Sequence, residues 1–112
     1  MTSTVQGNIV ILAPQGRIDH ASANAFSLAL APHLAECKSD GTALVLDFSR
    51  IEYISSIGLR ALMLASRQVS SQTGSIAIAA LTPMVRDVFE ISRFNLVFKV
   101  FDTVDIAIAA VE

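Results

Sequence analysis

Three short segments of the chain are apolar almost throughout, and this feature limits the possible folds more than any other. They are Ile9–Leu12, Thr42–Phe48 and Ser75–Leu81. A strand with one face in water alternates apolar and polar residues, whereas continuous apolarity is typical of a strand covered on both faces. Because segments with helical periodicity lie between these strands, we expect an α/β fold in which helices pack against a parallel or mixed sheet.

Two helices are expected in the first two thirds of the chain. The segment 59–71 has the clearer pattern, because one of its faces gathers Leu59, Leu62, Met63, Ser66 and Val69. The earlier helix is expected to begin near Ala21, with Asp19 or Ser22 as its cap. Pro32 lies inside this segment. An interior proline removes a hydrogen bond and clashes with the preceding turn, so we expect a kink or a break just before it.

Thr82 and Pro83 predict the start of a third helix, since threonine is favoured at the N-cap and proline at the first helical position. This helix is expected to run to about Ser92. Asn95 would then close it, because asparagine tolerates the left-handed conformation that often ends helices.

The end of the chain predicts one more strand and one more helix. Leu96–Phe101 reads as the strand, and Asp102 or Thr103 would cap the helix. Residues 5–18 are expected to be extended, which gives the order β-β-α-β-α-β-α-β-α. We therefore expect one domain over residues 1–112, with a mixed, mostly parallel sheet of about five strands flanked by about four helices.

Composition and charge argue against several classes of partner. The net charge is −2 and no cluster of Lys and Arg is present, so we expect no nucleic-acid partner. No continuous apolar run reaches the roughly 20 residues of a membrane span, and no basic segment precedes Ile9 as in a signal peptide. We expect no membrane partner. Cys37 is the one cysteine, which fits a reducing compartment, so a cytoplasmic location is expected.

The residue pattern does not favour catalysis. His20 and His33 have no cysteine or histidine at a metal-ligand spacing, so no metal site is expected. The adjacent serines Ser55 and Ser56 are not in a G-x-S-x-G elbow, and no nucleotide-binding glycine motif is present. We therefore expect neither enzyme activity nor a cofactor.

The two serines lie where a strand gives way to a helix. One interpretation is structural, because either hydroxyl could accept a backbone N–H and cap the helix. The other is a switch, because the unpaired N–H groups and positive dipole of a helix N-terminus also accommodate a phosphate. Ile57 would place an apolar side chain beside the switch, Gly58 would leave room for a partner, and Arg60 lies one turn into the helix.

The segment from Leu44 to Met63 resembles the signature of STAS domains, and in particular of bacterial anti-sigma factor antagonists. Asp47-Phe48-Ser49 matches the end of the family's strand, D-x-S. Tyr53–Leu59 matches the family's aromatic or apolar pair followed by S-S-x-G-L. Gly16–Asp19 and Phe98–Val111 are similar to other parts of the family, and the predicted element order is the family's order.

The resemblance implies a phosphorylation-gated binding protein. By this resemblance Ser56 is the phosphorylated residue, with Ser55 as the alternative, and the partner-binding residues are Ser55, Ser56, Ile57, Gly58 and Arg60. The unphosphorylated domain would bind an anti-sigma factor that is also a serine kinase, and so free the sigma factor. The kinase would phosphorylate Ser56 with Mg-ATP, and a metal-dependent serine phosphatase would reset the switch.

Two other hypotheses remain open on the sequence. The domain could be a STAS module that is not phosphorylated and docks on a transporter or a larger signalling assembly. It could also be a small enzyme acting through Ser55 or Ser56, although no base is evident near them.

Overall fold

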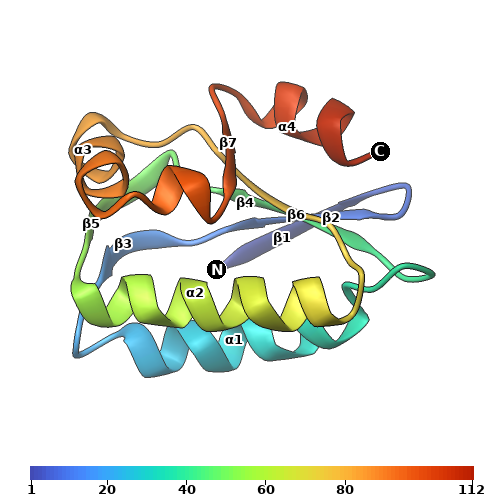
Figure 1. Ribbon diagram of the computed structural model, residues 1–112, viewed down its shortest axis with the longest axis horizontal. Helices are drawn as coiled ribbons and strands as arrows, with labels where there is room; N and C mark the ends of the chain where they lie inside the picture. The colour runs from blue at the N-terminus through green and yellow to red at the C-terminus, as the bar shows by residue number, and fades with distance from the viewer.

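A central sheet with helices on both faces organises the chain, as Figure 1 shows for the computed structural model, which describes residues 1–112. The strands are β1 (Thr2–Gln6), β2 (Ile9–Ala13), β3 (Gln15–Ile18), β4 (Ala43–Asp47), β5 (Arg50–Ile54), β6 (Ile76–Ala79) and β7 (Lys99–Phe101). The helices are α1 (Ala23–Glu36), α2 (Ser56–Ser71), α3 (Pro83–Ser92) and α4 (Val104–Val111), with a 3-10 turn, η1 (Phe94–Leu96), after α3. None of these helices has the combined length and apolarity that crossing a bilayer demands.

The main sheet has five strands in the order β1-β2-β4-β6-β7. β1 pairs with β2 antiparallel, and the other neighbours are parallel. The predicted mixed, mostly parallel sheet and the four helices are therefore confirmed. The structure adds a separate pair of short parallel strands, β3 and β5, which the sequence analysis did not resolve.

The two faces of the main sheet are covered by different helices. Leu44 and Leu46 of β4 point into a large core shared with α1 and α2. Ala43 and Val45, which alternate with them, point into a smaller core under α4. All four side chains are buried, which is why the strand is apolar on both faces. In Figure 1, α1 and α2 lie side by side below the sheet and α4 lies above it.

Helix α1 continues without a break through Pro32 to Glu36, so the predicted break before the proline is wrong. Proline cannot donate to the carbonyl one turn earlier, which belongs to Leu28. Leu28 and Pro32 are both exposed, so water can satisfy that carbonyl. A proline on the solvent side of the last turns is therefore tolerated here.

The C-terminal end of α1 is fastened to the end of α2. The side chain of Gln72 donates its Nε2–H groups to the carbonyls of Leu34 at 2.8 Å and Cys37 at 2.9 Å. Carbonyls at the end of a helix have no partner within the helix, and these bonds satisfy two carbonyls at this end of the element.

Helix α3 ends at Arg93, whose left-handed φ of 61° closes it, and not at Asn95 as expected. Asn95 lies within η1 instead. The ring of Phe94 packs edge-on against Phe89 with centroids 5.7 Å apart, and this contact places the turn directly after Arg93. At the start of α4 the expected capping is confirmed for Thr103, whose Oγ1 accepts the Ile106 N–H at 3.1 Å.

Candidate functional site

The β3–β5 pair holds the junction between strand and α2. Ile18 pairs with Ile54 at its end, and the Ser55 N–H donates to the Ile18 carbonyl at 2.8 Å. On the other side, the hydroxyl of Thr82 at the start of α3 donates to the Ile51 carbonyl at 2.9 Å. The two strands are therefore fixed between α2 and α3 at one end of the domain, and Figure 1 shows α2 beginning where β5 ends.

The two serines of the junction occupy different positions. Ser55 has the extended backbone of an N-cap, and its Oγ accepts the Gly58 N–H at 3.3 Å. Its carbonyl accepts the first helical N–H, from Leu59, at 2.9 Å. Ser56 is the first residue of α2 and is exposed, and no hydrogen bond within the chain involves its hydroxyl. Ser55 therefore caps the helix, while the Ser56 hydroxyl faces solvent.

Gly58 is buried against β3 and β5, so the space left by its missing side chain is filled from within the domain. A Cβ at this position would lie 2.8 Å from the Ile18 carbonyl oxygen and 2.7 Å from Cγ1 of Ile54. Real Cβ atoms do not approach other atoms this closely. The glycine is required because α2 starts in contact with β3 and β5.

A shallow apolar groove of about 240 Å³ begins beside the junction and runs between α1 and α2. We call it the α1–α2 groove. It is lined by Ala23, Asn24 and Ser27 from α1 and by Ile57, Arg60, Ala61 and Leu64 from α2. Ile57 is 49% exposed and Leu64 is 52% exposed, and Arg60 has no carboxylate within ion-pair distance. The groove thus combines exposed aliphatic side chains with one unpaired cation.

The expected site residues are only partly brought together. Ser56, Ile57 and Arg60 lie at the exposed start of α2, whereas Ser55 is half-buried and Gly58 is internal. Leu64 and the α1 side of the groove were missed. Their signal is present in the sequence, because Ile57, Arg60 and Leu64 recur at spacings of three, four and seven and so share a second face of α2.

A small charged cluster lies on the outer face of the β3–β5 pair. The Arg17 guanidinium lies over the Tyr53 ring, 4.4 Å from its centroid, and Arg17 Nε lies 3.4 Å from an Asp19 carboxylate oxygen. Desolvation acts to raise the pKa of Asp19. Hydrogen bonds from the backbone of Ala21, the hydroxyl and backbone of Ser22, and Arg17 lower this pKa and together outweigh desolvation, so the net pKa lies below its usual value. Asp19 therefore holds the turn before α1 as a carboxylate.

Asp19 and Ser22 both lie at the start of α1 as expected, but neither side chain accepts an N–H from within the helix. Ser22 is the N-cap residue, but its hydroxyl makes no bond to the helix. It donates to the Arg17 carbonyl at 2.6 Å instead. Asp19 Oδ1 accepts the N–H groups of Ala21 and Ser22 just before the helix.

Comparison of the sequence with known proteins identifies similar proteins over nearly the whole chain. The STAS domain family model matches residues 1–107. A protein of Bordetella bronchiseptica named as an anti-sigma factor antagonist, BtrV, is 36% identical over 102 residues, which cover 91% of this chain and 85% of BtrV. The anti-sigma-F factor antagonist RsfB of Mycobacterium tuberculosis is 26% identical, with 99% of this chain and 88% of RsfB covered.

The fold of a solved relative is also similar. The crystal structure of an anti-sigma factor antagonist from Mycobacterium paratuberculosis superposes with a TM-score of 0.86 at 25% identity. The match covers 98% of this chain and 91% of the other. With the family model spanning nearly the whole sequence, the chain belongs to the STAS domain family.

Proposed function

We propose that this protein is an anti-sigma factor antagonist whose binding to its anti-sigma factor is switched off by phosphorylation of Ser56. The observation that carries the proposal is the exposed, uncommitted hydroxyl of Ser56 at the first position of α2, beside the α1–α2 groove. The relatives named as anti-sigma factor antagonists support the class of partner.

Ser56 suits phosphorylation better than Ser55. The Ser55 hydroxyl is half-buried and accepts the Gly58 N–H, so a phosphate there would displace the cap. The Ser56 hydroxyl is in solvent and leaves the cap intact when it is modified. Ser55 remains the alternative site if Ser56 is not the acceptor.

Helix α2 can accommodate the added charge. Its first turn contains no acidic residue, so the positive end of its dipole has no negative side chain beside it. Arg60 lies four residues after Ser56 and therefore on the same side of the helix. A phosphate carries a charge of about −1.5 to −2, and Arg60 can pair with it. Phosphorylation would therefore change the surface without unfolding the helix.

The same phosphate would oppose docking at the α1–α2 groove. A partner that covers Ile57 and Leu64 must remove water from the start of α2. Removing water from an incompletely paired charge costs several kcal/mol, and about 4 kcal/mol corresponds to roughly a thousandfold loss of affinity. The neutral hydroxyl of Ser56 imposes no such cost.

The chemistry of the cycle requires two enzymes. An anti-sigma factor that is also an ATP-dependent serine kinase transfers the γ-phosphoryl group of ATP to Ser56 Oγ, and ADP and the hydroxyl proton are released. A serine phosphatase adds water to the phosphoserine, which frees inorganic phosphate and restores the hydroxyl. The antagonist itself contributes no catalytic group to either step in this proposal.

The decisive experiment isolates the chain from its source bacterium and measures the binding of the serine kinase that we expect to be retained with it. We expect Ser56→Ala to bind it with or without ATP, and Ser56→Asp to lose binding. Ser39→Asp is the matched control, because it adds the same charge to another exposed serine, after the far end of α1, and should bind like the wild type. Mass spectrometry that finds phosphate on neither serine would favour the module that docks without phosphorylation.

A second experiment tests the groove itself. Leu64→Asp places a charge on an exposed groove residue, so we expect unchanged folding and at least about tenfold weaker kinase binding, as for an interface residue worth more than 1 kcal/mol. Ile91→Asp on α3 is the control, since Ile91 is 84% exposed and lies outside the groove. Equal binding by both variants would place the docking surface elsewhere.

A further inference from the structure

Strand β1 forms one edge of the main sheet and is covered on neither face. All five of its residues are exposed, and Val5 is 68% exposed. It contains no charged residue and no proline. Edge strands of natural proteins normally carry charges, prolines or bulges that prevent pairing with another chain. β1 lacks these protections.

The opposite edge of the sheet is protected in the usual way. β7 has only three residues, and its first, Lys99, is exposed and charged. Short edge strands and lysine side chains both discourage edge-to-edge pairing. Of the two edges of the main sheet, β1 is therefore the one suited to accept another strand.

The hairpin geometry identifies which groups of β1 are free. Gly7 and Asn8 form a two-residue loop, in which the first residue has a positive φ of 62° as a type II′ turn requires. The flanking pair of such a loop exchanges hydrogen bonds, and antiparallel pairs alternate between bonded and non-bonded. Ser3 and Val5 lie opposite Leu12 and Val10 at non-bonded positions, so their N–H and C=O groups point away from β2.

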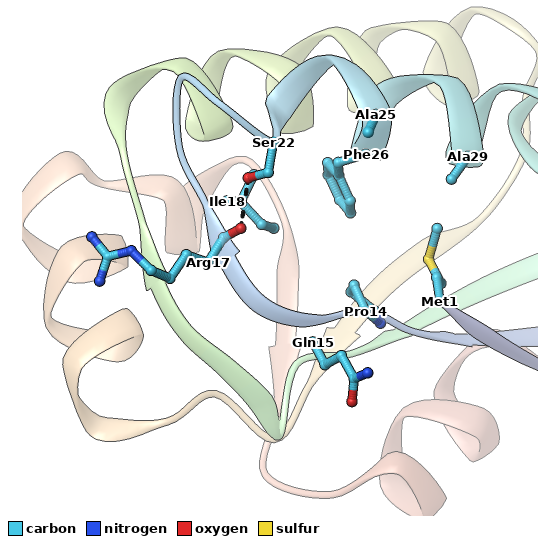
Figure 2. Close-up of a pocket in the computed structure, with 9 residues that line it drawn as sticks. All are labelled: Met1, Pro14, Gln15, Arg17, Ile18, Ser22, Ala25, Phe26 and Ala29. Carbon is cyan, nitrogen blue, oxygen red and sulfur yellow. Dashed lines mark hydrogen bonds between the residues drawn. The ribbon is translucent and has the colours of Figure 1, made fainter.

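A hollow of about 360 Å³ lies beside β1 on the α1 side of the sheet. Figure 2 shows the side chains of Phe26 and Met1 pointing into it, while the guanidinium of Arg17 and the amide of Gln15 point away. Val5 lies opposite Val10, whose side chain belongs to the core under α1, so Val5 faces the same side as the hollow. The apolar hollow and the exposed side chain of Val5 therefore lie on the same face of the sheet.

We propose that β1 pairs antiparallel with β1 of a second copy, so that two five-stranded sheets join into one. A pairing centred on Thr4 lets Ser3 of each copy exchange hydrogen bonds with Val5 of the other. It also places Val5 of the second copy next to Ser3, on the face of the sheet that bears the apolar hollow. The arrangement is two-fold symmetric, so each copy supplies and accepts the same groups and the assembly closes as a dimer.

The contact area sets the strength of the dimer. A standard specific interface buries about 800 Å² on each partner. The proposed contact consists of the five residues of β1 and the hollow beside Met1, so it is small against that standard. We therefore expect a concentration-dependent dimer.

Sedimentation velocity tests the proposal on the full chain, over about 10 μM to about 1 mM, the range of weak specific contacts. The mass should rise from the 11.9 kDa monomer towards twice that value. Val5→Pro should stay monomeric, because proline is accepted on an edge where its missing N–H faces solvent. Val5→Lys should also stay monomeric and serves if the proline variant does not fold. Ile91→Lys, at another exposed aliphatic residue, should dimerise like the wild type.

Amide hydrogen exchange locates the contact. The Ser3 and Val5 amides should exchange several-fold more slowly at high protein concentration, whereas the Thr4 amide, which bonds to β2, should be protected at every concentration. A chain that remains monomeric throughout the range overturns the proposal. A dimer in which Ser3 and Val5 gain no protection also overturns it, because its interface would then lie elsewhere.

Discussion

Ser55 and Ser56 are adjacent in the chain, but their hydroxyl groups have different environments and different roles. The Ser55 Oγ accepts the Gly58 N–H at 3.3 Å and so caps α2, while the Ser56 hydroxyl is exposed and makes no bond within the chain. A hydroxyl used as a cap is needed for folding, and one that is free can be modified without loss of the fold. This division of roles predicts that alanine at Ser55 destabilises the domain, whereas alanine at Ser56 leaves its stability nearly unchanged.

Ser55→Ala should lower the free energy of unfolding by about 1 kcal/mol, because the Gly58 N–H loses its acceptor at the helix start. Ser56→Ala should change it by less than about 0.5 kcal/mol, as is usual for exposed residues without partners. Urea denaturation of both variants measures the difference. If the two substitutions were equally destabilising, the assignment of the cap to Ser55 would be wrong.

Ser56→Asp should fold normally and raise the free energy of unfolding by about 0.3–1 kcal/mol, because a negative charge is favourable at a helix N-terminus that has none. In an Arg60→Ala background, Ser56→Asp should raise the free energy of unfolding by less. Arg60 lies on the same side of the helix one turn later, so its removal leaves the new carboxylate without a cation to pair with. Thermal denaturation at low salt provides the measurement. Loss of partner binding by Ser56→Asp could then be attributed to charge, and not to unfolding.

Gly58→Ala should destabilise the domain by about 1 kcal/mol or more. Alanine favours helices over glycine by up to about 1 kcal/mol, but the new Cβ would overlap the Ile18 carbonyl and the Ile54 side chain, and overpacking costs roughly 1–3 kcal/mol. Denaturant unfolding checks the sign. A stabilised variant would mean that α2 can move away from β3 and β5 at little cost.

Acid should remove the stabilisation that Asp19 provides. The pKa of this carboxyl is lowered in the folded state, so the charged form contributes stability above the unfolded-state pKa, and this contribution is lost as the pH falls through the folded-state pKa. Wild type should therefore be more stable than Asp19→Asn at pH 7, and the difference should shrink as the pH falls below the ordinary range of an aspartate pKa. A difference that did not change with pH would show that the carboxylate charge has no part in it.

The main sheet could be predicted because its strands are specified locally. β4 and β6 are apolar on both faces, and this pattern is visible without knowing what covers them. β3 and β5 have mixed polarity and five residues or fewer, with an irregular register between Gly16 and Arg17. Each segment forms a strand because the other pairs with it. The two are far apart in the sequence, so neither segment alone carries a residue pattern that predicts the pairing.

The site could be located from the sequence but not resolved residue by residue. Two adjacent serines before a helix can both serve as caps, and only the extended backbone of Ser55, with ψ near 175°, decides between them. A glycine near a helix start fits either an open surface or close packing. For Gly58 the answer depends on Ile18, which lies forty residues earlier and is brought beside it by the β3–β5 pairing.

The bonds from Gln72 to the carbonyls of Leu34 and Cys37 bear on how a partner would bind. They join the ends of α1 and α2, whose opposite ends flank the α1–α2 groove near Ser56. Bonds at one end of the pair oppose the sliding of one helix along the other, so the two sides of the groove keep their register before any partner binds. Docking then loses little conformational entropy in the antagonist, because preorganised surfaces spend less of their interaction energy on becoming ordered.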